Sequence, residues 1–108
     1  EAVCARWIEQ GPALVVLTRG PQGLAAWRRG RAVVAVPGQP VEVADTVGAG
    51  DTFNAGALTA LHEAGALTKA RLAALTDAEL DAALTLGTRA AAVTVSRAGA
   101  NPPWRHEL

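Results

Sequence analysis

A glycine-rich turn that leads into a helix is the segment of this sequence best suited to chemistry. Gly48 and Gly50 let the backbone turn tightly and let a ligand approach the main chain closely. The helix expected to begin here leaves its first N–H groups unpaired and carries a partial positive charge, and both features favour a phosphate. Asp51 follows in the first helical turn. The segment therefore predicts an anion site with a carboxylate beside it.

Asp51 has two interpretations. An aspartate in the first turn of a helix accepts backbone hydrogen bonds and complements the helix dipole, which is a structural role. Next to a bound triphosphate, the same carboxylate could instead take the proton from a hydroxyl that attacks the γ-phosphoryl group. The residue types alone leave both roles open.

Two common phosphate-binding motifs do not fit this turn. A P-loop requires a lysine immediately before its helix, and the only lysine of the chain is Lys69. A Rossmann fingerprint requires a third glycine where this chain has Phe53. Neither of these two motifs therefore accounts for the turn.

Strand patterns alternate with helical patterns, which predicts an α/β fold. The apolar run over residues 13–18 is typical of a parallel strand that is buried on both faces. Thr76 and Glu79 have the spacing of a capping box, and the arginines at 28, 29 and 31 are expected in a solvated turn. The expected helices cover 1–10, 48–64, 69–75 and 76–92, and the expected strands cover 13–18, 24–28, 31–36 and 93–96.

Composition and charge exclude several classes of protein. The 108 residues carry ten basic and ten acidic side chains, which argues against a nucleic-acid partner or a charged membrane surface. No apolar run reaches the ~18–20 residues that span a bilayer. Cys4 is the only cysteine, so an intrachain disulfide is excluded and it is expected in the core. A cytoplasmic location fits these features.

The segment from Asp45 to Phe53 (Asp-Thr-Val-Gly-Ala-Gly-Asp-Thr-Phe) closely resembles the C-terminal signature of the ribokinase-like (PfkB) carbohydrate kinases. Residues 18–23 resemble the Thr-x-Gly-x-x-Gly nucleotide loop of that family, and residues 93–104 are most similar to bacterial fructokinases. The resemblance implies that residues 1–108 form the C-terminal, nucleotide-binding portion of a three-layer α/β/α sandwich. The N-terminal portion of the family, with its sugar-binding residues, lid strands and acidic residues for magnesium, has no counterpart here.

The resemblance also implies a role for each matching position. Asp51 corresponds to the catalytic base. Ala49, Gly50 and the main chain of Asp51, which follow Gly48, correspond to the anion hole for the transferred phosphoryl group. Further residues correspond to contacts with ATP, namely Thr18, Gly20, Gly23 and Gly50 near the phosphates and ribose, and Thr88 and Asn101 near the adenine.

A monovalent cation, K+, is a further expected ligand because many family members bind one beside the anion hole. The corresponding ligands are the Asp45 side chain and the carbonyls of Val47, Thr94, Arg97 and Gly99. Some relatives add a serine where this chain has Pro103, so the coordination of the cation differs here.

The resemblance implies an ATP- and Mg2+-dependent kinase that phosphorylates a sugar hydroxyl, with fructose as the favoured substrate. Ribose, 2-keto-3-deoxygluconate or a nucleoside are alternatives within the family. A nucleotide-binding module without catalysis and a purely structural fragment are alternatives of other classes. We expect the 108 residues to be inactive alone, and to form a homo-oligomer or to pair with the N-terminal portion through the apolar surface that this portion would cover.

Overall fold

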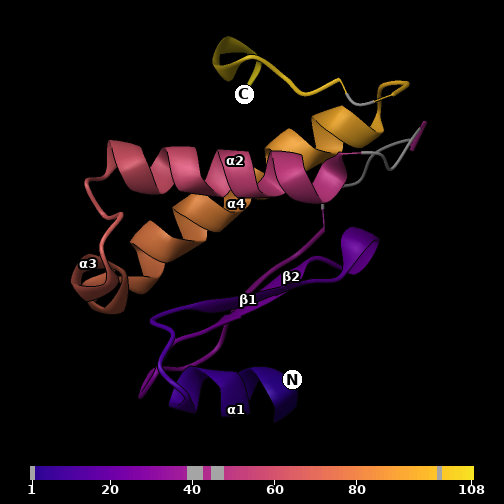
Figure 1. Cartoon of the computed structure of the whole chain (residues 1–108). Helices are drawn as coiled ribbons and strands as arrows, with labels where there is room; N and C mark the ends of the chain where they lie inside the picture. Colours follow the sequence, from indigo (N-terminus) through magenta and orange to yellow (C-terminus); the bar gives the residue numbers. More distant parts are fainter. Residues whose placement is uncertain (1, 39–42, 45–47, 100) are drawn as a thin grey trace.

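A small sheet lies between two layers of helix (Figure 1). The computed structural model describes residues 2–38, 43–44, 48–99 and 101–108. Helix α1 lies on one face of the sheet, and helices α2 and α4 cover the other, so the expected α/β/α layering is confirmed. The helices are α1 (Ala2–Glu9), α2 (Ala49–Glu63), α3 (Lys69–Ala74) and α4 (Asp77–Val95), the strands are β1 (Val15–Thr18), β2 (Leu24–Trp27) and β3 (Val34–Val36), and the 3-10 turns are η1 (Gly20–Gln22) and η2 (Arg105–Glu107).

The sheet has the order β1-β2-β3, and both pairings are antiparallel. Val16 lies opposite Ala26, and Leu24 lies opposite Val36. The expectation of a parallel, fully buried strand over residues 13–18 is therefore wrong for the described part of the chain. The turn η1 is too short for the crossover that a parallel pair needs, so it folds β2 back against β1.

Helices α2 and α4 pack against each other at two glycines. A Cβ atom at Gly56 would lie 2.9 Å from the Cα atom of Gly87, and one at Gly87 would lie 2.7 Å from the Phe53 carbonyl oxygen. The two backbones are therefore in direct contact, which larger side chains would prevent. Around this crossing the buried apolar side chains form one core, which includes Leu24, Val36, Phe53, Leu61, Leu75, Leu80 and Leu84.

A capping box explains where helix α4 begins, and packing against α2 explains how far it continues. Its start is the predicted capping box, in which Glu79 N–H donates to Thr76 Oγ1 (3.1 Å) and Thr76 N–H donates to Glu79 Oε1 (2.9 Å). These bonds hold the pKa of Glu79 below its ordinary value. The strand expected over residues 93–96 is wrong, because α4 continues to Val95. Packing of the fully buried Thr94 against α2 outweighs the strand preference of the branched residues there.

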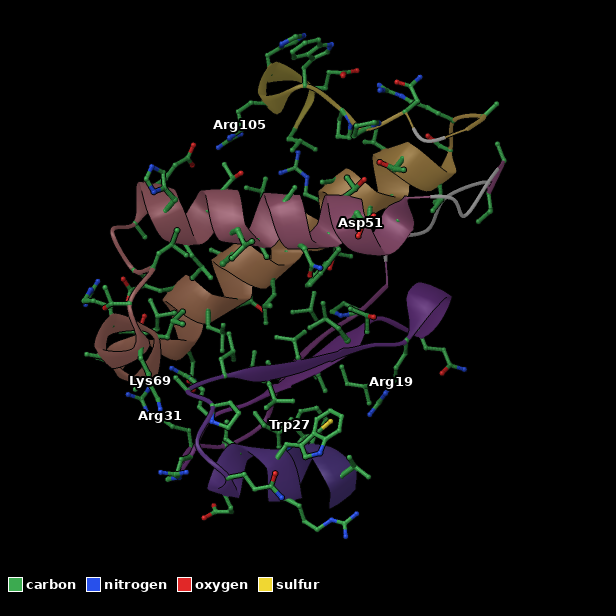
Figure 2. The ribbon with its side chains drawn as sticks, in the orientation of Figure 1. Arg19, Trp27, Arg31, Asp51, Lys69 and Arg105 are labelled. Atoms are coloured by element: carbon green, nitrogen blue, oxygen red, sulfur yellow. The ribbon has the colours of Figure 1, made fainter. Side chains whose placement is uncertain are left out.

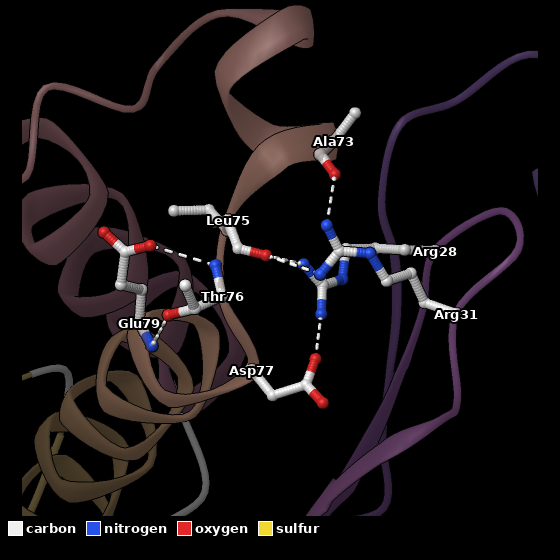
Figure 3. A network of polar contacts seen from close by, with 7 residues as sticks. All are labelled: Arg28, Arg31, Ala73, Leu75, Thr76, Asp77 and Glu79. Carbon is white, nitrogen blue, oxygen red and sulfur yellow. Dashed lines mark hydrogen bonds and ion pairs between the residues drawn. The ribbon is translucent and has the colours of Figure 1, made fainter.

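Of the three arginines expected in a solvated turn, Arg29 and Arg31 are exposed, whereas the expectation is wrong for Arg28. Figure 3 shows the contacts of Arg28 and Arg31. Arg28 is buried and donates to the Leu75 carbonyl and to the carboxylate of Asp77. Arg31 donates to the same Leu75 carbonyl at 2.9 Å. That carbonyl follows the last turn of α3 and has no helical partner, so the arginines satisfy it and tie the sheet to the helical layer.

Two further sequence features can be placed in the fold. Cys4 is buried, as expected of a core cysteine. Within the described ranges, no helix combines the length and the apolar composition that crossing a bilayer requires.

Candidate functional site

A cleft of about 130 Å3 is lined by residues of the sheet, of η1 and of helices α2 and α4. The turn η1 and the start of α2 lie at the same end of the molecule (Figure 1). Six residues expected from the sequence to contact nucleotide lie around it: Thr18, Gly20, Gly23, Ala49, Gly50 and Thr88. Leu24, Phe53 and Ala91 complete its lining. Segments that lie far apart in the sequence thus form one small site.

The lower wall of the cleft is the turn between β1 and β2. Gly20 and Gly23 both have positive φ angles, +58° and +90°, which favour glycine. Arg19 N–H donates to the Gly23 carbonyl at 2.7 Å and closes the turn. A Cβ atom at Gly23 would lie only 2.2 Å from the Val36 carbonyl oxygen, so no other residue fits there. Glycine therefore lets this turn pack directly on β3.

The upper wall is the start of α2. Gly48 is the N-cap residue and has a left-handed backbone, with φ +81°. The first helical hydrogen bond runs from Thr52 N–H to the Gly48 carbonyl (2.9 Å), so the N–H groups of Ala49, Gly50 and Asp51 precede it. A Cβ atom at Gly50 would meet nothing within 4 Å. Among the described residues no acceptor is bonded to these three N–H groups, and Ala49 and Gly50 line the cleft, which suits an anion such as a nucleotide phosphate.

Asp51 lies at the same end of the molecule, exposed, in the first turn of α2 (Figure 2). The N-cap position itself belongs to Gly48, so Asp51 is not the capping residue. Its charge still complements the helix dipole. Asp51 is exposed, but it is not among the residues that line the cleft, so its role as a general base stays a prediction.

Asn101 does not line the cleft. It is exposed and lies in the tail that follows α4. The tail runs over α2 and α4 on the side away from the sheet (Figure 1), where Arg105 pairs with Glu63 at 3.3 Å. The structure thus separates Asn101 from the other nucleotide-contacting residues expected from the sequence.

The expected cation ligands are only partly described. Asp45 and Val47 lie outside the described residues. Ala44 N–H donates to the Val95 carbonyl at 2.7 Å, which brings the segment before Asp45 to the end of α4. The Thr94 carbonyl accepts a hydrogen bond from Arg97 N–H (3.1 Å). The cation site therefore stays a prediction.

The sequence did not indicate how α4 contributes to this site. Thr94 Oγ1 donates to Thr52 Oγ1 at 3.0 Å, across the interface between α4 and α2. No local pattern signals a bond between residues so far apart. Phe53 and Leu24 were recognisable from the sequence only as apolar core positions.

Comparison with known proteins identifies the family and the fold. Residues 1–107 match the pfkB family of carbohydrate kinases. The chain belongs to this family. It is 44% identical over 80 residues to a fructokinase of Rhizobium leguminosarum bv. trifolii, a match that covers 74% of this chain and 24% of the relative. The family predicted from the signature around Asp51 is thus confirmed.

Solved structures confirm the ribokinase fold. The ribokinase of Thermotoga maritima superposes with a TM-score of 0.79 at 29% identity, over 99% of this chain and 32% of that one. A candidate ribokinase II of Escherichia coli, crystallised with ATP and Mg2+, superposes with a TM-score of 0.70 at 28% identity, over 91% of this chain and 27% of that one. This pfkB chain therefore spans about a quarter to a third of the relatives it matches.

Proposed function

We propose that these residues are the nucleotide-binding portion of an ATP-dependent sugar kinase that transfers the γ-phosphoryl group to a sugar hydroxyl. The observation that carries this proposal is the cleft, where the glycine turn after β1 faces the open N-terminus of α2. The membership of the pfkB family and the ATP held by the Escherichia coli relative support it.

ATP would place its phosphates between the two walls of the cleft. Gly20 and Gly23 would allow the phosphate chain to lie against the turn, because neither offers a side chain. The γ-phosphate would lie at the N–H groups of Ala49 and Gly50, where the partial charge of the helix terminus stabilises the negative charge of the transferred group. Thr88 lies on the same cleft and would face the nucleoside end.

Asp51 would act as the general base. Its carboxylate would accept the proton of the sugar hydroxyl while that oxygen attacks the γ-phosphorus, and the bond from the γ-phosphorus to the β–γ bridging oxygen would break to release ADP. Positioning and charge stabilisation supply most of the catalysis in such transfers. A module that only binds nucleotide has no need of a carboxylate at this position.

Mg2+ would accompany ATP and neutralise the phosphate oxygens. Within the described residues, no three His, Cys, Asp or Glu side chains gather as a metal site. The resemblance places the acidic residues for this ion in the N-terminal portion of the family, so we propose that its protein ligands lie there. K+ beside the anion hole remains part of the proposal through Asp45 and Val47 and the carbonyls near the end of α4.

Fructose is the sugar that we favour, supported by the identity to the Rhizobium fructokinase. Ribose, 2-keto-3-deoxygluconate and nucleosides remain alternatives within the family, and the first of these is supported by the ribokinase likeness. The 108 residues alone would bind ATP without phosphorylating sugar, because the relatives contain about three to four times as much chain.

Calorimetric titration of the chain with ATP is the first test. Saturable binding with one site supports the nucleotide cleft, and no binding at millimolar ATP would leave only a structural fragment.

An exposed groove beside β1, with Leu58 and Leu67 about half exposed, leads us to propose self-association or pairing with the N-terminal portion. Sedimentation velocity would contradict self-association if dilute chain remained monomeric.

A chimera tests the chemistry. In it, this chain replaces the matching part of the Rhizobium fructokinase, and the assay follows ADP released with fructose. Asp51→Asn should lower kcat by about 10²–10⁴-fold, the usual share of a general base, with ATP affinity retained. Asp81→Asn, an exposed carboxylate on α4 away from the cleft, is the matched control. Turnover of the Asp51 variant within a few-fold of the parent would exclude Asp51 as the base.

A further inference from the structure

Two threonine hydroxyls connect the buried end of α4 to the first residue of the proposed anion hole. Thr94 is fully buried, and its Oγ1 donates to Thr52 Oγ1 at 3.0 Å. Thr52 Oγ1 in turn donates to the Gly48 carbonyl at 2.8 Å. The same carbonyl also accepts the Thr52 N–H at 2.9 Å. The Gly48 carbonyl thus accepts two bonds from one residue, and the hydroxyl of that residue accepts a further bond from Thr94.

The orientation of this carbonyl determines where one proposed phosphate donor points. A trans peptide is planar, and its C=O and N–H groups point in opposite directions. The Gly48 carbonyl and the Ala49 N–H belong to the same peptide unit. Holding the carbonyl inward, toward the body of α2, therefore aims the Ala49 N–H outward from the helix terminus, into the cleft that Ala49 lines.

A glycine N-cap makes such support necessary. Gly48 has no side chain that could bond to the helix, and glycine has more backbone freedom than any other residue. The loop before it is attached to the same end of α4, because Ala44 N–H donates to the Val95 carbonyl at 2.7 Å. The last turn of α4 therefore holds the chain on both sides of the segment 45–47.

From this geometry we infer that Thr94 and Thr52 are positioning residues of the phosphoryl-transfer site, which act by fixing the Gly48–Ala49 peptide. The inference rests on the proposed function for its catalytic meaning. It assigns a role to the Thr94 hydroxyl, which is separate from the Thr94 carbonyl expected near the cation.

The direct test measures the peptide itself and needs no nucleotide. The 15N relaxation of the chain gives the order parameter of the Ala49 N–H vector. Thr94→Ala and Thr94→Ser differ by the hydroxyl alone. The serine variant should keep this order parameter at about 0.85, and the alanine variant should lower it below about 0.6. Thr59→Val is the control, because the Thr59 hydroxyl bonds only to the Ala55 carbonyl of its own helix at 2.7 Å. Equal order parameters in the two Thr94 variants would overturn the inference.

Nucleotide binding gives the functional readout. Thr94→Ala should lower the affinity for ATP about three- to tenfold, the equivalent of one ordinary hydrogen bond. It should leave the affinity for adenosine unchanged, because adenosine has no phosphate. Thr94→Ser should restore ATP affinity. Equal loss of ATP and adenosine would show general damage and overturn the positioning role. If the parent chain binds neither, the nucleotide proposal fails, and the order parameters of Ala49 alone decide the inference about the peptide.

Discussion

Gly50→Ala separates the proposed binding role of the α2 terminus from its contribution to stability. Gly50 lies within the helix and a Cβ atom there meets nothing within 4 Å, so the fold accepts alanine without strain. Alanine restricts the unfolded chain and favours helix, which should stabilise the protein by about 0.5–1 kcal/mol. For a domain of this size the melting temperature should rise by about 2–8 °C.

The same methyl group should impair ATP binding. It would project from Gly50, which lines the cleft where the γ-phosphate is proposed to lie. Loss of one charge-assisted hydrogen bond costs about 1.5–3 kcal/mol, which corresponds to a roughly ten- to hundredfold higher Kd for ATP. Thermal unfolding by circular dichroism and calorimetric titration with ATP measure the two effects on one protein sample.

Thr59→Ala is the matched control for this variant. It also raises helix propensity in α2 but lies away from the cleft. It should raise the melting temperature and leave ATP affinity unchanged. Unchanged ATP affinity in Gly50→Ala would refute the placement of the phosphate at Gly50. A lower melting temperature would instead refute the structural reasoning about this glycine.

Three further predictions concern stability and are checked by urea unfolding. Gly87→Ala should destabilise the chain by about 1–3 kcal/mol, because its Cβ atom would lie 2.7 Å from a carbonyl oxygen of α2; an unchanged midpoint would contradict the direct helix contact. Arg28→Leu should lower the free energy of unfolding by about 1.5–3 kcal/mol. Asp77→Asn should lower it by about 1 kcal/mol or less, because that carboxylate is 66% exposed. A larger loss of stability in the Asp77 variant than in the Arg28 variant would contradict the buried role of the arginine. The pKa of Glu79 is lowered in the folded state from its ordinary value of 4.5. The Glu79 carboxylate therefore stabilises the folded state fully above that pH, and this stabilisation is lost as the pH falls through the lowered pKa. Glu79→Gln should therefore flatten the loss of stability below about pH 4.5, and a pH profile identical to the parent would contradict the capping box.

Local rules predicted much of the proposed site. The turn at Gly48 and Gly50, the helix that follows and the capping box of α4 all depend on residues within one or two turns of one another. The resemblance named Gly20 and Gly23, and the structure adds their positive φ angles, which glycine adopts at little cost. The signature around Asp51 then indicated the family, and the family match agrees.

Long-range contacts decided the features that the sequence did not reveal. Residues 93–95 have branched side chains typical of strands, yet the burial of Thr94 against α2 keeps them helical. The sequence predicts that Arg28 is solvated, because its partners, the Leu75 carbonyl and Asp77, lie in the other layer and far away in the sequence.

The sequence by itself therefore determined the glycine turn that we propose binds phosphate and the helix behind it, because these follow from backbone preferences of neighbouring residues. Its signature also indicated the family. Only the tertiary structure brought the turn after β1 opposite the start of α2. It also brought Thr94 into contact with Thr52, whose hydroxyl bonds to the Gly48 carbonyl. The physical reason is that such pairings depend on how whole layers pack, and the free energy of packing is shared among residues that no local pattern connects.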